Sequence, residues 1–202
     1  MDAKAQLVFS LQSIGAIKFG AYKLKSGILS PFYLDLRILV SYPGVLRETA
    51  QVMAQLLSTL KFDRIAAIPY AALPIGTAVA LEMDRPLIYP RREKKDYGTG
   101  RAVEGEYRAG ETAVVIDDVI TTGVSKLEAI QPLSAAKLKV HDIVVLIDRE
   151  QGGAHEVSKR GYQVHSVLKI TEVMQILKEA GKATESQQRD VLAFLSKNGG
   201  SQ

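Results

Sequence analysis

Residues 112–125 read TAVVIDDVITTGVS, and this stretch decides the expected fold. Thr112–Ile116 is almost wholly apolar and predicts a buried strand, and a helical pattern begins at Ser125. Strands that are apolar throughout are typical of parallel sheets whose two faces are both covered. Because ligands collect at the carboxyl ends of such strands, the residues between this strand and this helix are candidates for a binding site.

The segment after the strand joins two acids to a turn of small residues. A turn that leads into a helix N-terminus presents backbone N–H groups to a phosphate. Hydroxyl donors are available from Thr121, Thr122 and Ser125. Gly123 lets the backbone approach the phosphate closely. Asp117 and Asp118 suit sugar hydroxyls or a hydrated Mg2+ instead. Together these residues indicate a ribose 5-phosphate site, and the alternative is a capped turn that merely starts a helix.

Strand and helix patterns alternate on both sides of this stretch. Further strands are predicted at Arg64–Pro69, Pro86–Pro90, Asp142–Ile147 and Gln163–Lys169, with two extended runs at Ile17–Leu24 and Phe32–Leu36. Helices are predicted at 3–14, Val45–Leu60, Pro74–Met83, Ser125–Ala136, Thr171–Ala180 and Thr184–Ser196. We therefore expect an α/β fold with a doubly wound, mainly parallel sheet. Residues 1–202 would form a single domain, with an N-terminal hood (1–40), a core (41–170), and C-terminal helices and a tail (171–202).

The composition excludes several kinds of chemistry. The chain has 202 residues, of which 47% are hydrophobic and 24% charged, and it has no cysteine. A disulfide frame, a thiolate metal site and a cysteine nucleophile are therefore excluded. The net charge of +4 is scattered, which favours a solvated surface or a small anionic ligand over nucleic acid. With neither a membrane-length apolar run nor a signal-peptide pattern, we expect a cytoplasmic protein without membrane attachment.

Several segments resemble known phosphoribosyltransferases. The pattern around DDVITTG resembles the motif with which type I phosphoribosyltransferases bind phosphoribosyl pyrophosphate (PRPP). Three more segments resemble orotate phosphoribosyltransferases, and the resemblance extends over roughly residues 15–165. They are FGAYKLKSG with SPFYLDLR (19–27 and 30–37), RREKKDYGTG (91–100) and DREQGG (148–153). The resemblance implies Mg2+-dependent transfer of ribose 5-phosphate from PRPP to orotate. It also implies a homodimer in which the basic loop of one subunit reaches the site of the other.

The resemblance implies roles for particular residues. PRPP would be bound by Lys25, Tyr70, Ala71, Arg91, Arg92, Lys95, Tyr97, Asp117, Asp118, Val119, Ile120, Thr121, Thr122, Gly123, Val124 and Ser125. Orotate would be bound by Tyr33, Leu34, Thr121 and Arg149. The catalytic residues would be Lys95, Asp117, Asp118 and Arg91. Mg2+ would be held mainly through pyrophosphate and water, with Asp117 and Asp118 as candidate protein ligands.

The chemistry of the residues supports these roles. Arg149 offers a planar fork for the oxygens of orotate, and Tyr33 or Phe32 could stack on its ring. Basic side chains in 91–95 can neutralise a departing pyrophosphate, and glycines at 98, 100, 105 and 110 predict a loop that opens and closes. The alternatives are ordinary strand packing for Tyr33, a surface ion pair for Arg149 and a solvated charge run for the loop.

Two positions depart from many bacterial members of the resembled family. Tyr97 stands where they have His, and Ala71 stands where they have Lys, so this chain has neither that imidazolium nor that ammonium. Both departures match the phosphoribosyltransferase domain of bifunctional UMP synthases, although the D-x-K-x-x-D pattern of their decarboxylase half does not occur. Two other functions fit the same PRPP motif. They are a purine or uracil phosphoribosyltransferase and a non-catalytic PRPP sensor that regulates transcription.

Overall fold

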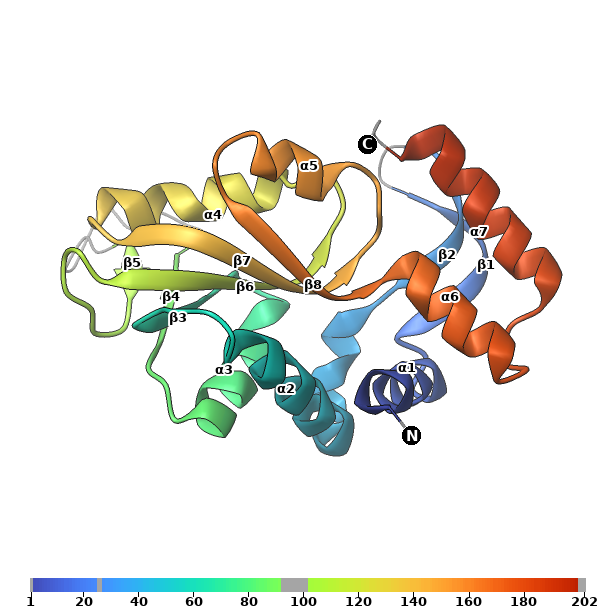
Figure 1. The fold of residues 1–202 in the computed structure, drawn as a ribbon, viewed down its shortest axis with the longest axis horizontal. Helices are drawn as coiled ribbons and strands as arrows, with labels where there is room; N and C mark the ends of the chain where they lie inside the picture. The colour runs from blue at the N-terminus through green and yellow to red at the C-terminus, as the bar shows by residue number, and fades with distance from the viewer. Residues whose placement is uncertain (1, 25–26, 92–101, 200–202) are drawn as a thin grey trace.

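A six-stranded sheet in the order β5-β4-β3-β6-β7-β8 forms the centre of the chain (Figure 1). The structure, a computed structural model, describes residues 2–24, 27–91 and 102–199. The strands are β3 (Arg64–Ala67), β4 (Leu87–Pro90), β5 (Val103–Glu104), β6 (Thr112–Ile120), β7 (Lys139–Asp148) and β8 (Gln163–Lys169). Every neighbouring pair is parallel except β4 and β5. The predicted α/β fold with a mainly parallel sheet is confirmed.

Helices cover both faces of this sheet. On one face lie α2 (Pro43–Leu57) and α3 (Ala72–Met83), and on the other lie α4 (Val124–Ala135) and α5 (Gly153–Ser158) (Figure 1). Alternate residues of β6 therefore enter two different cores. Val114 and Ile116 pack in the cluster that contains α2 and α3, whereas Ala113 and Val115 pack in the cluster that contains α4. This two-sided burial explains why the strand is apolar at every position from Ala113 to Ile116.

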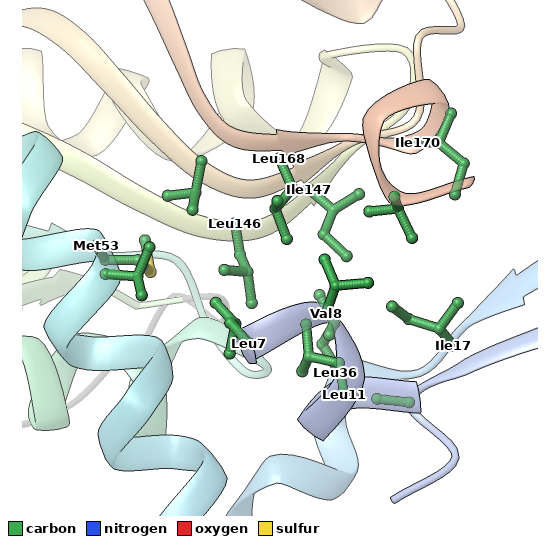
Figure 2. Close-up of a cluster of buried hydrophobic side chains, with 14 of the residues drawn as sticks. Leu7, Val8, Leu11, Ile17, Leu36, Met53, Leu146, Ile147, Leu168 and Ile170 are labelled. Atoms are coloured by element: carbon green, nitrogen blue, oxygen red, sulfur yellow. The ribbon is translucent and has the colours of Figure 1, made fainter. Parts of the chain in front are cut away.

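The larger core reaches beyond the sheet to the N-terminal helix α1 (Ala3–Ser13). Figure 2 shows Leu7, Val8 and Leu11 of α1 facing Leu146 of β7 and Leu168 of β8. All five side chains are fully buried. Burying a leucine side chain completely stabilises a fold by roughly 1.5–3 kcal/mol, so this contact anchors α1 firmly to the sheet.

A separate two-stranded sheet stands at one end of the molecule. It consists of β1 (Ile17–Lys23) and β2 (Leu29–Leu34), which pair antiparallel. The 3-10 helix η1 (Leu36–Ser41) follows it, and α6 (Ile170–Glu179) and α7 (Glu185–Asn198) complete the chain. The α7 helix lies beside this hairpin, since the ring of Phe194 meets the ring of Phe32 edge-on at 5.9 Å between centroids (Figure 1). Within the described ranges, none of the helices is both long and apolar enough to cross a membrane.

Several element bounds differ from those predicted. The strand β6 continues to Ile120 because its ladder with β7 extends to the Ile120–Asp148 pair, so the acid pair lies within the strand. The helix α2 begins at Pro43 itself, since proline suits the first helical turn. The short elements η1, β5 and α5 were not predicted, because they have too few residues for a clear periodicity. The domain bounds at residues 40 and 170 stay predictions.

Candidate active site

A cavity of about 410 Å³ lies where the strand order of the sheet reverses. The chain continues from β3 to β4 on one side and from β6 to β7 on the other, so the connections after β3 and β6 diverge. In open α/β sheets, ligands bind at such a switch point. The cavity is lined by Ile68, Pro69, Tyr70, Ala71, Pro90, Arg91, Asp117, Asp118, Val119, Ser125, Lys126, Glu128, Ala129 and Pro132. Residues predicted separately from three segments are thus brought together.

The acid pair is held by a compact set of contacts. Asp117 Oδ1 accepts from the Asp118 backbone N–H at 2.9 Å, and Asp117 Oδ2 lies 2.7 Å from Lys126 Nζ. Asp118 Oδ1 accepts from the Val119 N–H at 2.8 Å. Burial, together with the neighbouring Asp117 carboxylate, raises the pKa of Asp118 from 3.8 to about 7. The two carboxylates therefore have different environments although they are adjacent in sequence.

The predicted phosphate turn packs directly against the DREQGG segment. Gly123 has φ of +82°, and a Cβ there would come within 2.5 Å of Val157 Cγ2 and 2.9 Å of the Gly153 carbonyl oxygen. A Cβ on Gly153 would in turn lie 2.5 Å from the Thr121 carbonyl oxygen. Close packing within the protein requires glycine at both positions. For Gly123 this is a second reason for glycine, in addition to the predicted close approach of a phosphate. Two motifs about 30 residues apart are therefore one structural unit.

Two helix N-termini adjoin the cavity. Helix α4 begins at Val124, directly after the turn, and α3 begins at Ala72, directly after Tyr70 and Ala71. Neither N-terminus has a hydrogen bond from a capping side chain among the residues described. The peptide bond between Pro69 and Tyr70 is cis. Uncapped helix N-termini carry partial positive charge and free N–H groups, so the pair suits a ligand with a phosphate group at each end.

Arg149 lies at the end of β7 and is only 7% exposed. Its Nε donates to Gln151 Oε1 at 2.7 Å, and its Nη2 donates to Ser30 Oγ at 3.4 Å. The guanidinium also lies over the Phe32 ring, 4.5 Å from the centroid. Burial lowers the pKa of Arg149, and the described residues supply no acidic partner to offset this. A buried guanidinium without a carboxylate is prepared to receive an anion.

The predicted orotate residues on β2 differ in their surroundings. Phe32 is fully buried beneath Arg149, so its ring is not available for stacking on a base. Tyr33 is partly buried, stacks on Tyr22 at 5.4 Å between centroids, and accepts from Arg37 through its hydroxyl at 3.0 Å. Leu34 and Thr121 are also partly buried. Of the two aromatic candidates, Tyr33 therefore fits the stacking role better, and its contact with orotate stays a prediction.

Only one member of the predicted basic loop lies in the described part of the chain. Arg91 Nη1 forms an ion pair with Glu104 Oε1 at 3.0 Å, so a bound pyrophosphate would compete with Glu104 for it. Lys25, Arg92, Lys95 and Tyr97 lie outside the described residues, and their roles stay predictions.

The acid pair fits a magnesium ion that is bound chiefly by other oxygens. No group of three His, Cys, Asp or Glu side chains suited to a metal occurs within residues 2–24, 27–91 and 102–199. Both oxygens of Asp117 already bind protein groups, which leaves Asp118 Oδ2 as the better candidate. Mg2+ usually keeps several waters and takes substrate phosphates as ligands, so this donor set suits it. Mg2+ binding stays a prediction.

Sequence reasoning missed one residue of the site, Lys126. Its side chain is 4% exposed and lies between Asp117, Ser125 and the Val119 carbonyl. A signal was present, because Lys126 is a lysine in the first turn of the helix that follows an acid pair. Lysine is common on exposed helix faces, however, and nothing in the pattern distinguishes a buried one.

Comparison with known proteins agrees with this geometry. The model of the phosphoribosyl transferase domain matches residues 37–179. The bifunctional enzyme PyrF/PyrE of Nostoc sp. is 41% identical over 181 residues, which cover 90% of this chain and 38% of that protein. The orotate phosphoribosyltransferase of Pyrobaculum aerophilum is 40% identical over 191 residues, which cover 94% of this chain and 98% of that protein. The solved UMP synthase of Leishmania donovani is 43% identical with a TM-score of 0.89, over 97% of this chain and 43% of that one.

The fold, the cavity at the switch point and the domain match define a phosphoribosyltransferase, and the chain belongs to that family. Within the family it belongs to the orotate phosphoribosyltransferases, because it matches one of them along nearly the full length of both chains. The chain spans only 38% of the PyrF/PyrE relative and 43% of the UMP synthase structure.

Proposed function

We propose that the chain transfers the ribose 5-phosphate group of PRPP to orotate, giving orotidine 5'-monophosphate and pyrophosphate. The observation that carries this proposal is the cavity in which an acid pair lies beside two uncapped helix N-termini. The acids suit sugar hydroxyls, and the helix ends suit the 5-phosphate and the pyrophosphate. The name of the Pyrobaculum aerophilum relative supports orotate as the base.

In the proposed reaction, orotate N1 forms a bond to the anomeric carbon of the ribose. The bond from that carbon to the pyrophosphate oxygen breaks, and its electron pair leaves with pyrophosphate. Orotate binds with N1 already deprotonated, so no general base is required. The Thr121–Ser125 turn holds the 5-phosphate, and Asp118 accepts from the ribose hydroxyls, which aligns the two reactants. When bound, Mg2+ would supply positive charge to the pyrophosphate oxygens.

Arg149 provides the reason for preferring orotate to other bases. Its buried guanidinium has no acidic partner among the described residues. The carboxylate of orotate would complete this site, whereas uracil or adenine would leave a buried charge unpaired. A site built for a polar group rejects analogues that lack it, often strongly. A purine or uracil phosphoribosyltransferase would therefore have no substrate group for this arginine to bind.

The proposal is tested by pyrophosphate release. The protein is incubated with PRPP and Mg2+ and with orotate, uracil or adenine in separate reactions. We expect pyrophosphate release in the reaction with orotate and not in those with uracil or adenine. Chelating Mg2+ should abolish the release with orotate. Turnover of uracil or adenine in place of orotate would contradict the proposed substrate. PRPP binding without turnover of any base would instead favour the sensor function.

The proposal includes a homodimer in the cytoplasm that serves UMP synthesis. The basic loop would act in the partner's site, so two differently inactivated chains can complement each other. A mixture of Lys95→Ala and Asp118→Asn chains, unfolded and refolded together, should regain part of the activity that each lacks alone. No recovery, or a monomer in light scattering at assay concentration, would contradict the shared site.

A further inference from the structure

We propose that Lys126 is a positioning residue that holds the Asp117 carboxylate in place, so that Asp118 is the acid that contacts the sugar of PRPP. The inference rests on the proposed function, because it assigns different tasks to the two acids of the PRPP site. Sequence alone treats these acids as equivalent, since both follow the same buried strand.

Lys126 has an unusual position for a lysine. Its side chain is 4% exposed, and that of Asp117 is 8% exposed. Lysine is almost never fully buried unless it is paired. Lys126 Nζ lies 2.7 Å from Asp117 Oδ2 and 3.3 Å from Ser125 Oγ, and it also donates to the Val119 carbonyl oxygen. Three acceptors match the three hydrogens of an ammonium group, so its donors are satisfied by the protein itself.

These contacts fix both ends of the phosphate turn. Val119 lies before the turn in β6, and Lys126 lies after it in the first turn of α4. One side chain therefore ties the strand end to the helix start across the residues that are predicted to hold the 5-phosphate. A preset turn binds a phosphate more tightly because less conformational freedom is lost on binding.

The same contacts leave the two acids with unequal freedom. Asp117 uses Oδ1 for the Asp118 N–H and Oδ2 for Lys126. Asp118 uses Oδ1 for the Val119 N–H, and its carboxyl also shares a hydrogen bond with the Asp117 side chain, but within the described ranges no N–H group of the protein donates to its Oδ2. Asp118 Oδ2 is thus the oxygen best able to accept from a ribose hydroxyl. Asp117 would act indirectly, by holding Asp118 in position through the hydrogen bond that it accepts from the Asp118 N–H.

Lys126 also makes the cavity less negative. Two adjacent carboxylates would repel the phosphates of PRPP, and a buried ammonium neutralises one of them. Removing Lys126 would leave Asp117 as an uncompensated buried charge, which is strongly unfavourable. We therefore expect the loss to affect PRPP much more than orotate.

The first test compares Lys126→Met with the parent protein. PRPP affinity is measured by calorimetry with Mg2+, and both Michaelis constants are measured by pyrophosphate release. We expect the dissociation constant and Michaelis constant of PRPP to rise about 30-fold or more, because the phosphate turn loses its preset shape and the cavity gains an unpaired carboxylate. The Michaelis constant of orotate should stay within about twofold. The control Lys159→Met removes an exposed lysine paired with Glu156 on α5 and should leave PRPP affinity unchanged.

The second test is a double-mutant cycle with Asp117→Asn. If Lys126 acts through Asp117, the losses of PRPP affinity in the two single variants should not add. The double variant should then bind PRPP at least about tenfold more tightly than the sum of the two single losses predicts. It should also recover thermal stability, because it contains no unpaired buried charge. Should Lys126→Met alone fail to fold, the double variant is compared directly with Asp117→Asn: equal PRPP affinity is expected if Lys126 acts through Asp117, and a further loss of about tenfold or more would overturn the inference. Additive effects of the two changes on PRPP affinity would overturn the inference.

Other outcomes separate the inference from the proposed function. PRPP affinity of Lys126→Met within about threefold of the parent, or equal rises for PRPP and orotate, would overturn the positioning role. If the parent binds PRPP but does not convert orotate, the proposed function fails while calorimetry still tests Lys126. If the parent does not bind PRPP at all, both fail.

Discussion

The guanidinium carbon of Arg149 lies 4.5 Å from the centroid of the Phe32 ring, and the Phe194 ring meets the same ring edge-on at 5.9 Å between centroids. Arg149 comes from the end of β7, Phe32 from the N-terminal hairpin and Phe194 from the last helix. The three side chains therefore form a row that joins distant parts of the sequence. Cation–π contact with a buried ring holds the guanidinium plane in one orientation, which is what recognition of a planar carboxylate needs.

We expect Arg149→Lys to raise the Michaelis constant of orotate by about 30-fold or more, because an ammonium cannot form the paired hydrogen bonds of a guanidinium. PRPP affinity by calorimetry should stay within about threefold, since the arginine does not line the cavity of the acid pair. The exposed Arg189, changed to Lys, is the matched control. An equal loss for both substrates would contradict a role in base recognition.

Phe194→Ala should lower the free energy of unfolding by about 3 kcal/mol, because it leaves a cavity beside Phe32. The Michaelis constant of orotate should also rise, because the Phe32 ring, over which Arg149 lies, would lose its contact with Phe194. Urea unfolding and steady-state kinetics measure the two effects. Leu192→Ala on the same helix removes a side chain that is 48% exposed and should cost less than about 0.5 kcal/mol. A stability loss with unchanged orotate kinetics would limit Phe194 to packing.

Gly123→Ala should destabilise the fold and abolish tight PRPP binding. The new Cβ would combine a left-handed backbone with a 2.5 Å contact to Val157 Cγ2. Gly110→Ala is the matched control, because Gly110 also has positive φ, +92°, but open space around its Cβ position. Backbone strain alone costs about 1–2 kcal/mol, and overpacking adds about 1–3 kcal/mol. Equal losses of stability in urea unfolding for the two variants would refute the packing explanation.

Asp118→Asn should remove a pH dependence of stability. The folded-state pKa of Asp118 is raised from 3.8 to about 7, so the folded chain holds this proton more tightly than the unfolded chain. The parent should therefore lose stability relative to the variant as pH rises from about 4 to about 7, and the difference should level off above that window. Thermal unfolding without PRPP and with chelator measures it. A parent that gains stability relative to the variant between about pH 4 and about pH 7 would show that the sign is wrong.

Lys95→Ala tests the basic loop, which rests on resemblance alone because Lys95 lies outside the described residues. We expect turnover to fall by about 100-fold or more while PRPP affinity changes much less, since the lysine would stabilise charge that develops on the departing pyrophosphate. Single-turnover kinetics and calorimetry separate the two effects. Unchanged turnover would remove this lysine from catalysis.

The sheet and the ligand turn could be predicted because their signals are local. Residues 113–116 are apolar at every position, a pattern expected when both faces of the sheet are covered, and that requires helices on each side. The acid pair and the small-residue turn are contiguous in the sequence, so their chemistry can be recognised without knowing the fold. The predicted bounds of the elements were less accurate. Strand β6 extends to Ile120 because its ladder with β7 does, and the local sequence of one strand does not indicate how far a neighbouring strand pairs with it.

The sequence by itself determined that this chain forms a parallel sheet and carries a PRPP-type motif at the end of one strand, because side-chain polarity and turn chemistry act between near neighbours. Only the tertiary structure decided that Phe32 is buried beneath Arg149 while Tyr33 is not, and that Lys126 turns inward to Asp117. Those outcomes depend on which distant surfaces exclude water from a side chain. That exclusion exists only once the hairpin, the sheet and the last helix have packed together.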